Sequence, residues 1–294
     1  MIDLHTHSNA SDGDLSPGQL IREAAKRGLG AIALTDHDTT DGLEIARKEA
    51  ENAKIRLIPG IEININWKGD CENGISGIGR GGEFHLLGLG IHSPSSGFTA
   101  AINELSRLRD VRNREIHRKM AEIGINASWE DVKSLSGGPS LGRLHFARLL
   151  IKMKIVKNVE QAFAGFLGPG KPLYVPKEGM IFEEAAALIR ESAGIPVLAH
   201  PGSLFLAWER FPELIKTLKN RGLAGIEAWH PAASPSLCRR LDDLGKSLGL
   251  IITEGSDYHG QVRPERKLGY SHRSRKIDDA VLEAIPELRA IEKI

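Results

Sequence analysis

Cysteine is scarce in this chain, with only Cys71 and Cys238 among 294 residues. Two isolated cysteines cannot build the disulfide framework of a small secreted domain, so we expect a reducing compartment. The chain also lacks an apolar run of the roughly 20 residues that a membrane-spanning helix needs, and its first residues do not resemble a secretory leader. We therefore predict a soluble, cytoplasmic protein with no membrane partner.

Aromatic residues are few as well, with 4 Trp, 3 Tyr and 8 Phe, and they form no series on which single-stranded bases could stack. The chain has 39 Lys and Arg residues and 38 Asp and Glu residues, so neither sign of charge is in large excess. We therefore expect no long duplex nucleic acid as a partner. The basic run at 107–119 is interpreted as an amphipathic helix with a solvated charged face, and steering of a polyanionic substrate is its alternative role. No coiled coil or apolar patch indicates an oligomeric state.

What the sequence does contain is a repeated alternation of apolar runs and amphipathic stretches. Repeated βα units predict parallel strands with helices outside them. Ser16-Pro17 and Ser234-Pro235 are expected to begin two helices, and Asp41 with Glu44 makes a cap-like pair before another. About seven strands favour a closed or distorted barrel over an open sheet; they are expected near residues 2–7, 30–35, 55–64, 83–91, 196–199, 224–228 and 250–254.

The alternation is interrupted once, by a mostly helical pattern between residues 98 and 172. Segments rich in Pro and Gly bound it, at 94–97 and 168–172. We predict a discontinuous barrel domain of residues 1–97 and 173–294, with residues 98–172 as a helical insertion that covers the active site. The glycine-rich stretch at 69–82 lacks a strand-to-helix context and is interpreted as a loop.

Metal-ligand residue types end most of the predicted strands. One such histidine is more often a core or surface residue, but His5 and His7 would share one face of an extended strand, and Asp257 and His259 repeat that spacing. The carboxyl ends of parallel barrel strands meet at one face, so the whole set predicts a multinuclear metal site. The candidate ligands are His5, His7, Asp12, His37, Glu62, His85, His200, Asp257 and His259.

Imidazole with carboxylate suits zinc, iron or manganese, and the lack of cysteine ligands argues against a structural thiolate site. Two residues beside His37 have two interpretations each: Asp36 and Asp38 would either orient its imidazole or cap the following helix. Ser8 and Ser11 are interpreted as local hydrogen-bonding residues rather than nucleophiles.

Several motifs resemble, in order, those of the PHP (polymerase and histidinol phosphatase) family. The resemblance covers the whole chain and rests on His5-Thr6-His7-Ser8, Ser11-Asp12-Gly13, Thr35-Asp36-His37-Asp38, Pro59-Gly60-Ile61-Glu62, Ala199-His200-Pro201 and Gly255-Ser256-Asp257-Tyr258-His259. Residues 142–148 and 170–175 are similar to a subgroup that hydrolyses nucleoside 3′,5′-bisphosphates and the ends of short RNAs. The resemblance implies a distorted (β/α)7 barrel, similar to a TIM barrel, with two or three divalent metal ions.

The resemblance also implies how the ligands divide among three metal positions. The first would use His5, His7, Glu62 and Asp257; the second Glu62, His85 and His200; the third Asp12, His37 and His259. Glu62 would bridge the first two positions. His92 is the alternative to His85, because residues 71–82 are unusual in length and composition.

Such a metal cluster would generate hydroxide at neutral pH and neutralise phosphate charge. We expect a metal-bound hydroxide, held by Glu62, His200 and Asp257, to attack phosphorus directly. The substrate is expected to be a small phosphorylated molecule, either a nucleotide or a short oligonucleotide. Its contacts would come from Arg143, Lys171 and His230. Histidinol-phosphate phosphatase is the alternative enzyme, and a non-catalytic regulatory metal-binding domain is the alternative of another class.

Overall fold

One seven-stranded sheet forms the centre of the computed structural model, which describes residues 1–66, 82–135, 141–272 and 274–291. Its strands neighbour one another in chain order. They are β1 (Ile2–Asp3), β2 (Ala31–Leu34), β3 (Arg56–Asn64), β4 (His85–Leu89), β5 (Ile195–Leu198), β6 (Gly225–Trp229) and β7 (Ile251–Glu254). A parallel bridge between Thr6 and Tyr258 joins the two ends of the sheet. The predicted distorted α/β barrel is therefore confirmed, as a nearly closed one.

Strand β4 departs from the expected parallel arrangement. It pairs antiparallel with both β3 and β5, whereas the other strand pairs in the sheet are parallel. Antiparallel strands can connect at the same end of a sheet, without a crossover. His85, the first residue of β4, is accordingly paired with Asn64, the last residue of β3. The reversal places the start of β4 at the carboxyl ends of the parallel strands.

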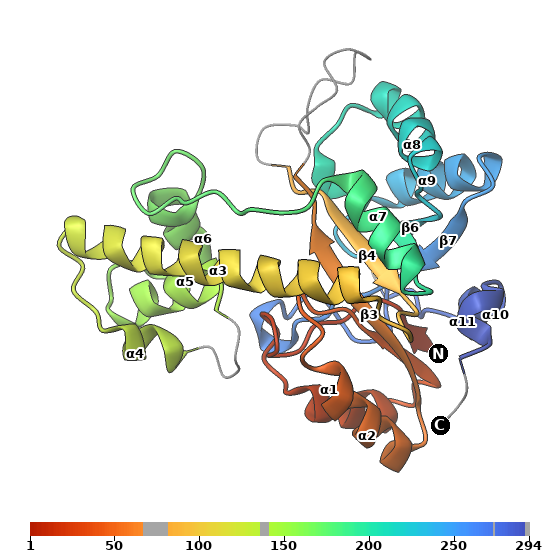
Figure 1. Cartoon of the computed structure of the whole chain (residues 1–294), viewed down its shortest axis with the longest axis horizontal. Helices are drawn as coiled ribbons and strands as arrows, with labels where there is room; N and C mark the ends of the chain where they lie inside the picture. The colour runs from red at the N-terminus through yellow and green to blue at the C-terminus, as the bar shows by residue number, and fades with distance from the viewer. Residues whose placement is uncertain (67–81, 136–140, 273, 292–294) are drawn as a thin grey trace.

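Helices cover the outside of the barrel (Figure 1). They are α1 (Pro17–Lys26), α2 (Leu43–Ala53), α7 (Phe182–Glu191), α8 (Phe211–Asn220) and α9 (Pro235–Ser247). The short helices α10 (Asp279–Glu283) and α11 (Pro286–Arg289) pack instead with the residues on the other face of the sheet. Ser16 and Ser234 cap α1 and α9 as predicted. The helix expected after Asp41 is present as α2, but the predicted cap is wrong, because Gly42 is its N-cap and no side chain caps it. Among the described residues, no helix is long and apolar enough to cross a membrane.

The barrel buries apolar side chains on both faces of its sheet. Ile58, Leu87 and Val197 belong to one buried cluster, which also receives Ile277 and Ile285 from the C-terminal segment. A second cluster joins α7, α8 and α9 to the other face of the sheet, and a third packs α1 and α2 on β2 and β3. Burial on both faces explains why the strand sequences are continuous apolar runs.

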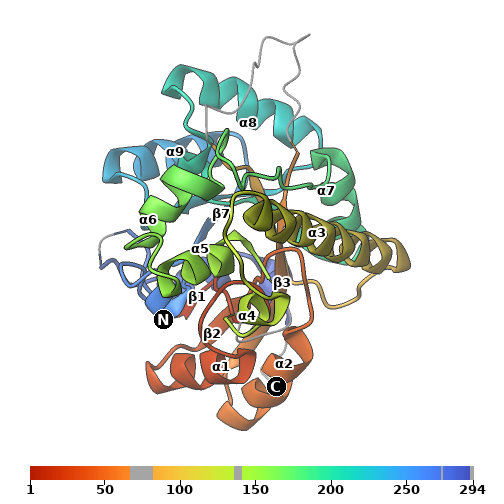
Figure 2. The same ribbon diagram turned by 90° about the vertical axis from the view of Figure 1, so that its left-hand side faces the viewer.

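The helices between β4 and α7 extend to one side of the barrel (Figures 1 and 2). They are α3 (Ser96–Glu122), α4 (Trp129–Lys133), α5 (Arg143–Lys152), α6 (Val159–Ala162) and the π-helix η2 (Phe163–Leu167). Phe98, Ile102 and Leu105 of α3 pack in the barrel core. The later residues of α3, from Ile116 onward, join a separate hydrophobic cluster with α5 and η2. Helix α3 therefore packs against the barrel with its first half and against the other helices of this group with its second half.

Candidate metal centre

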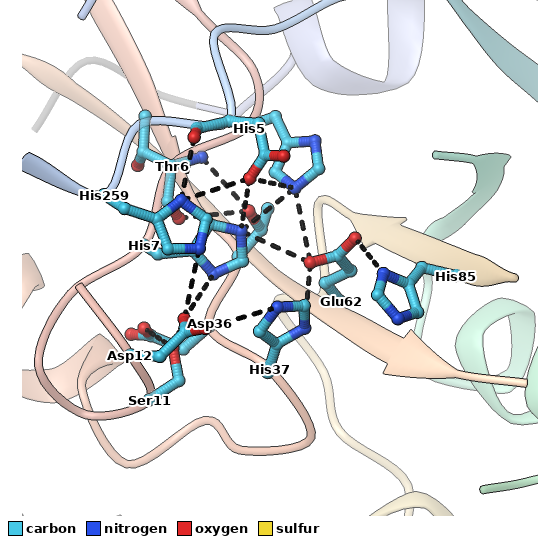
Figure 3. A network of polar contacts seen from close by, with 12 residues as sticks. His5, Thr6, His7, Ser11, Asp12, Asp36, His37, Glu62, His85 and His259 are labelled. Atoms are coloured by element: carbon cyan, nitrogen blue, oxygen red, sulfur yellow. Dashed lines mark hydrogen bonds and ion pairs between the residues drawn. The ribbon is translucent and has the colours of Figure 1, made fainter. Parts of the chain in front are cut away.

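Nine side chains of metal-ligand type meet at one end of the barrel, most of them visible in Figure 3. They form four overlapping groups, in each of which the ligand atoms lie within 4.8 Å of one another. The nine are the residues that the sequence predicts as ligands: His5, His7, Asp12, His37, Glu62, His85, His200, Asp257 and His259. The structure thus brings all nine candidates into one region.

The strand ends explain this convergence. His5 and His7 follow β1, His37 follows β2, and His200 follows β5. The period-two interpretation of Asp257 and His259 is wrong, because β7 ends at Glu254 and Asp257 has a left-handed backbone with φ 51°. A turn, rather than an extended strand, directs these two side chains into the centre.

The first group surrounds the paired histidines. The Nε2 atoms of His5 and His7 are 3.1 Å apart, and His7 Nε2 is 3.2 Å from Asp257 Oδ1. Glu62 Oε2 lies 3.4 Å from His5 Nε2 and 3.3 Å from His7 Nε2. Four ligand-type side chains therefore surround one small volume, as the family resemblance implies for the first metal position.

Glu62 also contacts the remaining groups. Its Oε1 lies 2.9 Å from His85 Nδ1 and 2.8 Å from His200 Nε2, while its Oε2 lies 2.9 Å from His37 Nδ1. His85 Nδ1 and His200 Nε2 are themselves 3.4 Å apart, so the expected trio of Glu62, His85 and His200 meets in one small volume. Glu62 is thus at the centre of the cluster.

The third expected position is represented by a group at the edge of the cluster. His259 Nε2 is 3.2 Å from Asp12 Oδ1, and His37 Nε2 is 3.9 Å from Asp12 Oδ2. His7 joins these three residues. Asp12 is the more exposed carboxylate here, at 27% for its side chain, whereas Glu62 is fully buried.

His85 and His92 are the two alternatives for the second metal position, and the structure places His85 in the cluster. His92 is exposed, and its Nδ1 donates to the carbonyl of Gly90 at 2.8 Å. The antiparallel course of β4 accounts for the placement of His85. Residues 67–81, which include most of the unusual segment before His85, lie outside the described residues.

Unpaired buried atoms indicate that the cluster fits a cation. Within the described residues, Glu62 Oε2, His7 Nδ1 and His37 Nδ1 are buried without a hydrogen-bond partner. Glu62 Oε2 and His37 Nδ1 lie only 2.9 Å apart, although they form no hydrogen bond with each other. Buried polar atoms without partners are costly, and lone pairs directed at a common volume can be satisfied by a divalent ion. Imidazole nitrogen and carboxylate oxygen are suitable donors for zinc, iron or manganese.

Electrostatic coupling within the cluster is strong. Burial alone would raise the pKa of Glu62, but His37, His85 and His5 hold that pKa well below its usual range. Burial opposes protonation of His7, yet Asp257 and Glu62 raise its pKa to about 9. Binding of a cation by these ligands would therefore be coupled to release of a proton, as from His7.

Glu227 supports the cluster from inside the barrel, and the sequence analysis assigned it no role. Its Oε1 accepts from His5 Nδ1 at 3.0 Å, and its Oε2 accepts from the backbone N–H of His200 at 2.8 Å. With Nδ1 donating to Glu227, the Nε2 of His5 is left to face the cluster. The signal available in the sequence was a glutamate inside an apolar strand, between Ile226 and Ala228.

Neither interpretation of Asp36 and Asp38 is correct. Asp36 accepts from Ser8 N–H, Ser8 Oγ and Ser11 Oγ at 2.8, 2.6 and 2.6 Å, so it orders the loop after β1. These bonds confirm the local role predicted for both serines. Asp38 instead pairs with Arg109 and Lys177.

Asp38 marks the edge of a cationic cluster formed by Arg109, Arg112, Arg143 and Lys177. Arg109 also donates to the carbonyl of His37 at 2.9 Å, which ties α3 to the candidate metal centre. Arg112 is 7% exposed, its Nε has no partner, and it pairs with no carboxylate among the described residues. Burial, then Arg109 and Arg143, lower the pKa of Arg112 to about 9. A buried guanidinium with an unpaired Nε and further cations beside it is a candidate for binding an anion, although Asp38 partly offsets its charge.

The three predicted substrate contacts lie in different surroundings. Arg143 begins α5 and lies 3.8 Å from Glu83. Lys171 is exposed, in the segment that follows η2. His230 is buried, with Nδ1 accepting from the N–H of Ala232 at 3.2 Å and Nε2 facing Asp257 Oδ2 at 3.2 Å. In this arrangement His230 orients Asp257, one of the candidate metal ligands.

A cavity of about 200 Å³ opens beside the cluster. Candidate ligands including Glu62, His85 and His200 form one side of it, and Arg263 and Arg266 contribute positive charge. Pro201, Phe205, Ala232 and Ala233 make a more apolar wall. The cavity can therefore hold a molecule with one anionic and one apolar part.

Comparison with known proteins relates this arrangement to enzymes. The PHP domain family model matches residues 3–164. A 5′-3′ exoribonuclease of Haemophilus influenzae is 34% identical over 87% of this chain and 89% of its own. A 3′,5′-nucleoside bisphosphate phosphatase of Chromobacterium violaceum is 32% identical over 92% and 91%. A solved Bifidobacterium adolescentis structure, described as a metal-dependent phosphoesterase, has a TM-score of 0.80 at 25% identity, covering 97% and 96%.

Proposed function

This chain belongs to the PHP domain family and is a metal-dependent phosphoesterase, and on that premise we propose that it removes a phosphate from nucleotides carrying two phosphate groups. The same hydrolysis at a phosphodiester bond would remove nucleotides from the 5′ end of a short RNA. Family membership also makes the chain a hydrolase, so a non-catalytic metal-binding domain is no longer an alternative.

The main support for this proposal is the convergence of nine candidate ligands, with Glu62 at their centre. We assign His5, His7, Glu62 and Asp257 to the first metal position, Glu62, His85 and His200 to the second, and Asp12, His37 and His259 to the third. Divalent ions bound there would supply a nucleophile at neutral pH and neutralise charge on the phosphate. Zinc, manganese and iron all suit these donors.

The chain's own residues hold this centre in orientation. Glu227 fixes the ring of His5 and the backbone of His200. Asp257 is contacted by His230 and by Arg266. Buried partners of this kind fix ligand geometry and restrict the ligands to one protonation state. Glu62, His200 and Asp257 are the ligands that would position the attacking water.

The second phosphate is assigned to the cationic cluster. Arg112 offers an unpaired guanidinium Nε, and Arg109 and Lys177 lie with Asp38 and Glu178 around the same small hollow of about 10 Å³, so a phosphate would bind at its mouth. A phosphate would neutralise the buried charge of Arg112 and accept charge-assisted hydrogen bonds. Arg143 is close enough to lower the pKa of Arg112 and belongs to this site. The exposed position of Lys171 leaves it as a weaker candidate.

Phosphate release from adenosine 3′,5′-bisphosphate tests the assignment. Protein loaded separately with manganese, zinc or iron is expected to release phosphate, and kcat/KM should exceed that for adenosine 5′-monophosphate by about tenfold or more. The Glu62→Gln variant is the inactive control. No turnover with any of the three metals would contradict the proposal, and a higher kcat/KM for histidinol phosphate would favour that alternative enzyme.

A further inference from the structure

Phe205 is unusual among the apolar side chains of this protein. It is 66% exposed, the highest value among the large hydrophobic residues that the structure describes. Its neighbours Leu204 and Leu206 pack against the barrel core. The exposure of Phe205 therefore arises in a segment anchored on both sides, rather than in a loose loop.

The backbone at this position is also unusual. Phe205 adopts φ 49° and ψ 41°, in the left-handed region that bulky L-residues rarely occupy. It follows the 3₁₀ helix η3 (Pro201–Leu204), and its N–H donates to the carbonyl of Gly202 at 3.3 Å. A glycine would adopt this conformation without strain. Packing in the folded state gives no evident reason for an aromatic residue there.

The position of the Phe205 side chain indicates a functional reason for its strained backbone. Phe205 borders the cavity that also contains His200, Glu62 and His85. Ser203 Oγ lies 2.8 Å from His200 Nδ1, which connects this short segment to the candidate metal centre. Ala232 and Ala233 continue the apolar wall, and the exposed Arg263 lies at the same cavity.

A ligand for this cavity needs an anionic group near the metal centre and a flat apolar group beside it. A nucleotide combines a phosphate with a flat base, and aromatic side chains bind bases through their π-faces. We propose that Phe205 is a specificity-determining residue on which a base of the substrate stacks. This inference rests on the proposed nucleotide-directed function and names a residue that selects nucleotides over other phosphate esters.

The test combines a protein variant with a substrate variant. The substrate is a 5′-phosphorylated diadenylate, compared with analogues in which either base is replaced by an abasic sugar. Phe205→Ala is expected to lower kcat/KM for the intact substrate by about 5- to 100-fold, mainly through KM. For the analogue that lacks the stacked base, wild type and Phe205→Ala should be equally active. Phe205→Trp should retain activity, whereas Phe205→Leu should resemble the alanine variant.

Ile45→Ala is the matched control, because Ile45 is also a large exposed apolar residue, at 56%, but lies on α2. Equal activity of wild type and Phe205→Ala on the intact substrate would overturn the inference. So would an equal loss on the intact substrate and on both abasic analogues. If the wild type hydrolyses neither this substrate nor adenosine 3′,5′-bisphosphate with any metal, the proposed function itself fails.

Discussion

At the scale of single residues, the candidate metal centre depends on side chains that hold ligands as well as on the ligands. Glu227 binds the ring nitrogen of His5 that faces away from the cluster. The amide of Glu227→Gln would keep the volume but lose the charge that favours this tautomer. Partners of metal ligands typically contribute 10- to 100-fold in affinity or activity.

We therefore expect Glu227→Gln to weaken metal binding by about 10- to 100-fold, measured by competition with a chelator. Glu254→Gln is the matched control, because Glu254 is also buried but pairs with Ser271 and Arg275. Unchanged metal affinity in Glu227→Gln would contradict an orienting role.

Arg112 illustrates a conflict between stability and binding. Its buried guanidinium has no carboxylate partner among the described residues, so replacing it with an apolar side chain should not lower stability. We expect Arg112→Met to leave the free energy of unfolding unchanged or raise it by about 1 kcal/mol. The KM for a nucleoside bisphosphate should rise by about 10-fold or more.

Denaturant unfolding and steady-state kinetics measure the two effects on Arg112→Met. Arg107→Met on the same helix is the control, because Arg107 is exposed and pairs with Glu104. A less stable variant with unchanged KM would indicate that Arg112 is structural and would remove it from the phosphate site.

At the scale of elements, helix α5 depends on a neutral histidine at its start. His145 Nδ1 accepts from the backbone N–H of Gly142 at 2.9 Å, and its Nε2 is buried without a partner among the described residues. Burial, with Arg148 nearby, lowers the pKa of His145 to about 4. The unfolded state therefore binds this proton more readily than the folded state does.

The sign of the pH effect follows from that difference. Stability contributed by neutral His145 is fully present above pH 6.5 and is lost as the pH falls from 6.5 towards 4. We expect the difference in unfolding free energy between wild type and His145→Gln to change by up to about 3 kcal/mol across this window. Urea unfolding at several pH values measures it, and a constant difference would contradict the assignment.

At the scale of the whole molecule, the candidate metal centre joins elements from both ends of the chain. His5 follows the first strand and Asp257 follows the last, so a cation held by both would oppose separation of the two ends. A ligand that binds only the folded state at about 1,000 times its dissociation constant stabilises by about 4 kcal/mol. For a chain of this size, that corresponds to roughly 5–10 °C in Tm.

Metal loading should therefore raise the Tm by roughly 5–10 °C, and a chelator should reverse the increase. Scanning calorimetry at matched protein concentrations measures both steps. The Glu62→Gln variant should respond weakly, because the Glu62 carboxylate lies within 3.4 Å of His5, His7, His37, His85 and His200. Equal responses of wild type and variant would contradict the central position of Glu62.

The sequence by itself determined the number of strands, the barrel and the residue types at the strand ends. These features depend on local periodicity and on motifs such as His5-Thr6-His7 and Pro59-Gly60-Ile61-Glu62, which a single chain displays directly. The same reasoning missed the direction of β4, because a strand's apolar pattern is the same in parallel and antiparallel pairing. His85 was harder to place than His5 or His200 for another reason, because residues 71–82 before it are unusual in length and composition.

Only the tertiary structure decided which polar residues meet outside the set of nine candidate ligands. Asp38 and Lys177 are far apart in the chain, as are Glu227 and His5, and no spacing rule relates them. Burial distinguishes Arg112 from the exposed arginines beside it on α3, although the local sequence treats them alike. The physical reason is that desolvation and pairing depend on distances through space, which packing of distant segments sets.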